Sequence, residues 1–219
     1  VWMSCRRNSD PAARSAPLLA ALEKADVAAR TALLPTLGRL GGNTSLVAVH
    51  AAMRSPDQAV RDAGYRALAN WPDASVADEL LQIAKTTAVP SYRIASLRAF
   101  IRVVSLPNQR PPQQTFEMLE SAMELATRAE ERALLVTRLG AVRVPEALGL
   151  LLSLVDDPQL GATAVPAVFT LAKGLTQSHP DRAKAALETI RPLTNNPAIR
   201  QQIPKVLRDI DARKLRPAQ

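Results

Sequence analysis

One spacing pattern recurs along the chain and limits its fold more than any other feature. With Arg61 as the origin, Ala63 follows at the second position, Leu68 at the seventh and Trp71 at the tenth. The same frame can be set at five further origins, which are Arg30, Arg93, Arg132, Ala164 and Arg200. The origins lie 31, 32, 39, 32 and 36 residues apart, and the seventh position is large and apolar in every copy. A period of this length is typical of stacked helical repeats, in which each unit buries its apolar face only against its neighbours.

Other segments with helical apolar spacing lie between these copies. They cover residues 17–25, 45–53, 77–85, 116–126, 145–155 and 182–190. Each would form helix A of a pair, and the framed segment after it would form helix B. Hydrophobic residues make up 47% of the chain but aromatic residues only 3%, so alanine, leucine and valine must build the core. This composition favours close-packed helices over a sheet. The sequence therefore predicts an all-α fold of about six antiparallel helix pairs.

The breaks between these segments contain residues that begin and end helices. Ser55-Pro56-Asp57-Gln58 is typical of a capping box with Ser55 at the N-cap. Asp10-Pro11, Asp157-Pro158 and Asn196-Pro197 each place a capping side chain before a proline that can occupy the first helical position. Gly41-Gly42 can end a helix with positive φ. Small residues such as Ala63 and Ala67 would allow neighbouring B helices to approach closely.

The segment SPDQAVRDAGYRALANW, residues 55–71, resembles a HEAT repeat. Its Pro and Asp in the turn, its Val-Arg pair and its Ala-Leu pair carry the resemblance, which extends in six copies over residues 13–211. The resemblance implies a right-handed α-solenoid that binds other macromolecules. It also implies that the repeated arginines and turn aspartates connect adjacent repeats. In this sequence these are Arg30, Arg61, Arg93, Arg132, Arg200, Asp26 and Asp57.

We expect three regions along the chain. Residues 1–12 would be a leader or the remnant of a longer chain, residues 13–211 the solenoid, and residues 212–219 a basic tail. The first residue is Val and the opening residues lack the apolar segment of a signal peptide, so we expect a processed product or a piece of a longer chain. The resemblance to degenerate bacterial HEAT-like repeats implies a module of a larger, bacterial protein. No apolar run of about 18 residues is present, which argues against membrane insertion. The compartment stays open.

The chain carries a formal net charge of +8. Positions five and nine of each B helix point away from positions seven and ten, and in this family that face lines the concave surface. These positions hold six basic residues, which are Arg39, Arg66, Arg98, Arg102, Lys173 and Lys205. Such a strip would attract acidic peptides, phosphates or nucleic acid. The alternative is a solvated helix face without a function.

The sequence contains no phosphate-binding loop and no nucleophile with a matching base, so we expect no enzymatic activity and no cofactor. His50 and His179 are isolated, and the single cysteine is Cys5, so metal ligation is not expected. A glycosylase-like activity would need an aromatic cleft with an acidic residue, and only Trp71 and Asp73 lie close together. Trp71 ends an apolar stripe and is expected in the core.

These observations favour a non-catalytic scaffold that binds a protein partner with an acidic surface through the basic strip, in which Arg66, Arg98 and Arg102 would contribute most. The main alternative is a polyanion or nucleic-acid binder that uses the same strip. A third is a spacer between other domains. No small-molecule substrate is expected. The Pro/Gln-rich segment 106–115 lengthens the fourth repeat and is expected to be a solvated connection.

Overall fold

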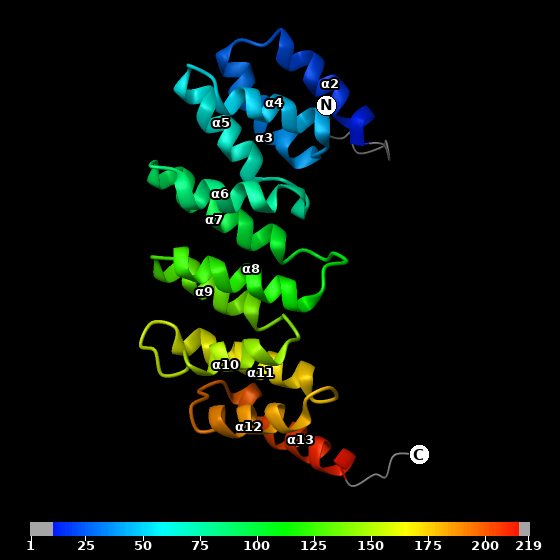
Figure 1. The fold of residues 1–219 in the computed structure, drawn as a ribbon, viewed down its shortest axis with the longest axis vertical. Helices are drawn as coiled ribbons and strands as arrows, with labels where there is room; N and C mark the ends of the chain where they lie inside the picture. Colours follow the sequence, from blue (N-terminus) through cyan, green and yellow to red (C-terminus); the bar gives the residue numbers. More distant parts are fainter. Residues whose placement is uncertain (1–10, 215–219) are drawn as a thin grey trace. The chain divides into compact units, whose positions relative to one another are not determined.

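The computed structural model describes residues 11–214, and every regular element in that range is helical (Figure 1). The chain divides into two compact units, Val1–Asn108 and Gln109–Gln219. The boundary falls inside the segment 106–115 that lengthens the repeat period. Three helix pairs lie in the described part of each unit, so the prediction of an all-α chain of six helix pairs is confirmed.

Unit 1 contains three pairs, in which α2 packs on α3, α4 on α5 and α6 on α7. The pairs stack within the unit, since α3 also packs on α5 and α5 on α7. A single 3-10 turn, η1 (Ala74–Val76), precedes α6. The helix bounds are α2 Pro11–Glu23, α3 Val27–Leu40, α4 Asn43–Met53, α5 Gln58–Ala69, α6 Ala77–Thr86 and α7 Pro90–Val104.

Unit 2 repeats the arrangement with α8 on α9, α10 on α11 and α12 on α13. Proline stands at the first helical position of α8, α10 and α12, where its missing N–H costs no intrahelical hydrogen bond. Here α9 packs on α11, and α11 on α13. The helix bounds are α8 Pro112–Leu125, α9 Ala129–Leu139, α10 Pro145–Leu152, α11 Gly161–Leu175, α12 Pro180–Ile190 and α13 Pro197–Lys214.

Two of the three B helices of unit 1, α3 and α5, begin at a side-chain cap. Asp26 is the N-cap of α3 and accepts a hydrogen bond from the backbone N–H of Ala29 at 2.8 Å. Asp57 is the N-cap of α5 and accepts from two backbone N–H groups. The predicted capping box is therefore wrong by two residues, because Asp57 and not Ser55 caps α5; the Ser55 hydroxyl accepts from the Asp57 N–H instead. Between α3 and α4, Gly41 and Gly42 have φ of 68° and 87°, as expected for a glycine helix end.

The seventh position of the frame lies in the core in every copy except the sixth, where Leu207 is half-buried. Leu37, Leu68, Phe100 and Leu139 are almost fully buried. Trp71 is buried as well, and its indole N–H donates to the Ser75 hydroxyl at 3.0 Å. These side chains fill the layers between the helices, as the sequence predicts, and burying each stabilises the fold by roughly 1.5–3 kcal/mol.

The fifth copy of the frame needs a correction of three residues. In the B helices with a polar cap, the framed arginine follows the capping residue by four positions, as in Asp57 and Arg61. Asp157 lies in the turn before α11, whose N-cap is Leu160, and its carboxylate accepts from the N–H groups two and three residues later, as that of Asp57 does. The corresponding origin is then Gly161 and not Ala164, and the seventh position becomes Val168, which is fully buried.

Neighbouring B helices approach each other through small residues at matching positions of the frame. A Cβ added at Gly38 in α3 would lie 2.1 Å from the carbonyl oxygen of Ala67 in α5. A Cβ added at Gly140 in α9 would lie 2.9 Å from the Cα of Ala167 in α11. Both glycines occupy the eighth position and both alanines the sixth, once the origin of the fifth copy is Gly161. The small residues of the sequence pattern therefore set the distance between backbones.

Candidate interaction surface

The B helices of unit 1 carry a strong excess of positive charge. Within α3, α5 and α7, seven arginines stand against a single acidic residue, Asp62. In α9 and α11 of unit 2, three basic residues stand against two acidic ones. The side chains of these seven arginines differ in burial and in their contacts.

Two arginines at the origin of the frame, one in each unit, close the turn inside their own helix pair. Arg61 Nη1 donates to the carbonyl oxygens of Ser55 and Pro56, at 2.6 and 2.7 Å. In unit 2, Arg200 Nη2 donates to the carbonyl oxygen of Thr194 at 2.8 Å. In both pairs an acceptor lies six residues before the arginine. These two arginines therefore hold their own A–B turns together, whereas the family resemblance implies contacts between repeats.

The other residues predicted to connect repeats have varied environments. Asp26 and Asp57 cap helices, as described above. Arg30 and Arg93 are exposed, and no hydrogen bond or ion pair of their side chains is found within residues 11–214. Arg132 in α9 acts on the next pair, since the N–H groups at the start of α11 lower the pKa of Asp157 and the charge of Arg132 lowers it further.

The predicted strip contains one residue with a structural contact. Arg102 is half-buried, and its Nη2 donates to the carbonyl oxygens of Ala69 and Trp71 at 3.1 and 2.6 Å. Burial lowers the pKa of its guanidinium, which is not deprotonated at any ordinary pH. Arg102 therefore ties α7 to the last carbonyls of α5, one repeat earlier. Its hydrogen bonds make it a connection between repeats rather than a free contact for a partner.

The other predicted members of the strip in unit 1 are exposed. Arg39, Arg66 and Arg98 lie on three successive B helices, and we call them the arginine face. The side chains of Arg39 and Arg66 have no ion pair within the described residues. Each guanidinium group can donate two parallel hydrogen bonds to a carboxylate that it meets.

The corresponding face of unit 2 has a different chemistry. Lys173 and Lys205 are exposed there, and Lys173 Nζ lies 3.4 Å from the Gln202 side-chain oxygen. The face between α9 and α11 holds a groove of about 430 Å³ instead of basic residues. Its lining is uncharged and consists of Thr137, Gly140, Ala141, Ala162, Thr163, Pro166, Ala167 and Thr170. The basic strip is thus concentrated in unit 1.

A polar cluster beside the arginine face was not identified from the sequence. The Tyr92 hydroxyl of α7 donates to the Asp62 carboxylate of α5 at 2.5 Å, and Gln58 donates to the same carboxylate. The hydrogen bond from Tyr92 is the main reason that the pKa of Asp62 lies below its usual value, and Arg66 and Arg61 lower it further. Burial, followed by the bond to Asp62, raises the pKa of Tyr92.

The same cluster contains an aromatic stack. The rings of Tyr65 and Tyr92 lie 3.7 Å apart between centroids with an angle of 14° between their planes. Asp62 and Tyr92 are 30 residues apart, about one repeat, which is the sequence signal that could have paired them. The cluster locks α5 against α7 and occupies the acidic residue of this face, so Arg66 is left without an ion-pair partner within the described residues.

The histidines have ordinary polar partners. His50 Nε2 lies 2.8 Å from Glu79 Oε1, which connects α4 to α6, and His179 Nδ1 lies 3.0 Å from the Ser178 hydroxyl. Within residues 11–214, no group of three His, Cys, Asp or Glu residues could hold a metal ion. No helix in this range is long and apolar enough to cross a membrane. Cys5 and the C-terminal residues 215–219 lie outside the described part of the chain.

Comparison with known proteins finds a family model that matches part of the chain. Residues 15–101 match the model of HEAT repeats. No curated protein matches the chain. A solved crystal structure of an engineered protein shares 16% sequence identity, covers 90% of this chain and 96% of its own, and has a TM-score of 0.47. A likeness of that size supports no argument about function.

Proposed function

Because residues 15–101 match the model of HEAT repeats, we propose that the protein is a non-catalytic scaffold that binds an acidic protein segment through the arginine face of unit 1. HEAT repeats are typically scaffolds for protein interaction. The observation that carries the proposal is the excess of seven arginines over one acid on α3, α5 and α7, with Arg39, Arg66 and Arg98 exposed.

The arginine face has the properties that such a function needs. Its helices are held at fixed separations by the backbone contact of Gly38 with Ala67 and by the bonds of Arg102 to the preceding repeat. The guanidinium groups therefore stand on a rigid support, which reduces the entropy lost on binding. A cluster of one sign of charge also raises the association rate with a partner of opposite sign.

The polar residues around this face have structural explanations that support a binding role over catalysis. Asp62 is hydrogen-bonded to Tyr92 and Gln58, and Asp57 is a helix cap. Arg61 closes a turn. A partner would therefore meet positive charge and backbone-anchored side chains, which suit recognition of a carboxylate-rich surface.

The experiment is a nuclease-treated affinity capture from a lysate of the source organism, with the wild type and two variants of equal charge change. The test variant is Arg39→Glu/Arg66→Glu/Arg98→Glu, and the control is Arg138→Glu/Arg143→Glu/Arg208→Glu in unit 2, where all three residues are exposed. Circular dichroism would first show that all three proteins are equally helical. Arg102, which belongs to the strip predicted from the sequence, is left out of the test variant because it ties α7 to α5.

We expect a discrete protein to be captured by the wild type and the control but lost with the test variant. Material that is captured only before nuclease treatment would instead identify a nucleic-acid binder, and its affinity would fall steeply as salt rises. Equal capture by the test variant and the control would contradict the arginine face as the binding site.

A further inference from the structure

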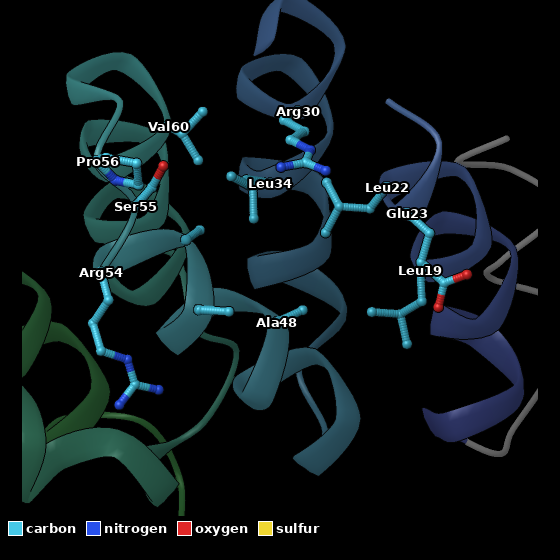
Figure 2. A pocket seen from close by; sticks show the side chains of 12 residues that line it. Leu19, Leu22, Glu23, Arg30, Leu34, Ala48, Arg54, Ser55, Pro56 and Val60 are labelled. Atoms are coloured by element: carbon cyan, nitrogen blue, oxygen red, sulfur yellow. The ribbon is translucent and has the colours of Figure 1, made fainter. Parts of the chain in front are cut away.

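A groove lies on a different part of unit 1, among α2, α3, α4 and α5. Its volume is about 480 Å³, within the range of sites for small molecules and short peptide side chains. Figure 2 shows leucines from α2 on one side, Leu34 of α3 in the middle, and the turn before α5 on the other side. The apolar lining consists of Leu19, Leu22, Leu34, Ala48, Ala51, Ala52, Pro56 and Val60.

The groove exists because α4 has small side chains where it faces α2. Ala48, Ala51 and Ala52 all line it, and α4 contains no Asp, Glu, Lys or Arg. The leucines opposite them are only partly covered, since Leu19 and Leu22 are half-buried. An apolar surface of this kind is stabilised when an aliphatic side chain covers it.

Two arginines lie at the margins of the groove. Arg30 of α3 extends over Leu22 and Leu34, and Arg54 lies on the other side of the apolar residues, with its guanidinium turned away from them (Figure 2). A rotation of this exposed side chain would bring the guanidinium to the margin of the groove. Both are exposed, and within residues 11–214 neither side chain has a hydrogen bond or ion pair. Among the described residues that line the groove, Glu23 is the only acidic one, and it forms no ion pair with either arginine at 4.0 Å or less.

A comparison of Arg30 with Arg61 shows why the guanidinium of Arg30 is available at the groove. Both occupy the origin of the repeat frame, but Arg61 donates to the carbonyls of its own turn whereas Arg30 makes no such bond. Arg30 therefore does not have the turn-closing contact of Arg61 and presents its guanidinium at the groove. The Arg30 guanidinium can therefore bind an anionic ligand without breaking a hydrogen bond to its own turn.

We propose that this groove binds a short peptide segment in which aliphatic side chains are flanked by acidic ones. The aliphatic side chains would cover Leu19, Leu22 and the alanines of α4, and carboxylates would accept hydrogen bonds from Arg30 at one side and Arg54 at the other. Two arginines against one glutamate favour an acidic occupant over a basic or neutral one. The site is separate from the arginine face and does not depend on it.

The test uses three fluorescein-labelled probe peptides with the central sequences Asp-Leu-Leu-Glu, Asp-Ser-Ser-Glu and Lys-Leu-Leu-Lys. Binding to the full chain is measured by fluorescence anisotropy, and the site is mapped by chemical shifts of isotope-labelled protein. Two variants address the two halves of the proposal: Arg30→Ala/Arg54→Ala removes the charges, and Ala51→Leu fills the groove at an exposed position. Arg93→Ala is the matched control, because Arg93 has the same place in the repeat frame on α7.

We expect the first peptide to bind about tenfold more tightly than either of the others, with shifts confined to α2, α3, α4 and the residues from Arg54 to Val60. Ala51→Leu should weaken binding about tenfold through loss of the apolar contact. Arg30→Ala/Arg54→Ala should weaken it by at least about tenfold, because it removes two charge-assisted hydrogen bonds, and Arg93→Ala should not weaken it. Equal affinity for the first two peptides, shifts elsewhere in the protein, or no binding at millimolar protein would overturn the proposal.

The outcome is independent of the scaffold proposal. The Arg39→Glu/Arg66→Glu/Arg98→Glu variant should bind the Asp-Leu-Leu-Glu peptide as the wild type does, if the groove is the site. If that variant loses the peptide while Arg30→Ala/Arg54→Ala retains it, the peptide binds the arginine face, and the groove proposal is wrong while the scaffold proposal stands.

Discussion

Unit 1 and unit 2 pack their B helices in the same way, but the exposed side chains of these helices differ between the units. In both units a glycine at the eighth position of one B helix meets an alanine at the sixth position of the next, as Gly38 meets Ala67 and Gly140 meets Ala167. The exposed face of these helices is basic in unit 1, whereas between α9 and α11 it is lined by threonine, alanine and proline. The comparison teaches that the residues which set helix separation are independent of those which a partner would meet. Four predictions test this separation.

The largest effect should come from the two close backbone approaches. We expect Gly38→Ala to lower the free energy of unfolding by more than about 3 kcal/mol, because its Cβ would lie 2.1 Å from a carbonyl oxygen. Gly140→Ala, with its nearest contact at 2.9 Å, should cost roughly 1–3 kcal/mol. Chemical denaturation measures both. Gly149→Ala is the control, since no atom lies within 4 Å of its Cβ, and it should stabilise α10 by about 0.5–1 kcal/mol. Equal effects at the three positions would refute the packing argument.

Arg102 should be the arginine on these helices whose loss costs most stability. Arg102→Ala leaves the carbonyls of Ala69 and Trp71 without their donor, and we expect a loss of about 1.5–3 kcal/mol in the free energy of unfolding. Arg66→Ala, an exposed arginine without an ion pair in the described residues, should change it by less than about 0.5 kcal/mol. A larger loss of stability in Arg66→Ala than in Arg102→Ala would contradict the role of Arg102 as a connection between repeats.

The turn-closing arginines should have a smaller effect. We expect Arg61→Ala to lower the free energy of unfolding by about 1 kcal/mol, since the carbonyls of Ser55 and Pro56 lose a charged donor but stay near solvent. Arg93→Ala, at the same place in the frame but exposed, should be neutral within about 0.5 kcal/mol. Thermal unfolding of both variants decides whether the repeated arginine stabilises every pair or only those in which it reaches the turn.

The smallest effect should be a pH dependence specific to unit 1. The pKa of Asp62 is lowered in the folded protein, mainly by the hydrogen bond from Tyr92, so its contribution to stability is complete above the ordinary value of 3.8. That contribution is lost as the pH falls through the lowered pKa. Melting temperatures measured from about pH 6 to about pH 2.5 should therefore fall less in Asp62→Asn than in the wild type. The melting temperature of Tyr92→Phe should also fall less with pH than that of the wild type. Parallel pH profiles in all three proteins would exclude a contribution of the Tyr92–Asp62 hydrogen bond to stability.

Much of the fold was predictable because it depends on periodicity. The seventh-position side chains Leu68 and Phe100 are buried, and the long loop before α8 contains the boundary between the units. The prediction for the fifth copy was wrong by three residues because the frame was anchored on a small residue, Ala164, and α11 contains no arginine that marks its origin. The hydrogen bonds of Asp157 in the turn, and the approach of Gly140 to Ala167, indicate Gly161 as the origin.

The candidate site was less predictable because it depends on what each guanidinium reaches. A helical frame gives the direction of Arg66 and Arg102 alike, but only the structure shows that Arg102 meets the end of α5. It also shows that Arg30 and Arg61 share one frame position but not one contact. Contacts between repeats, such as that of Asp62 with Tyr92, join residues about one period apart and require the packing of both helices to be known.

The glycine at the start of α11 limits which residues this position can hold. A Cβ at Gly161 would lie 2.5 Å from the carbonyl oxygen of Val155, six residues earlier, whereas in two other pairs the guanidinium groups of Arg61 and Arg200 donate to the carbonyl six residues earlier. In the α10–α11 pair the main chain of the turn packs directly onto the start of the helix. An arginine at this position would collide with that main chain, so the pair could gain a turn-closing arginine only if the turn itself changed its conformation.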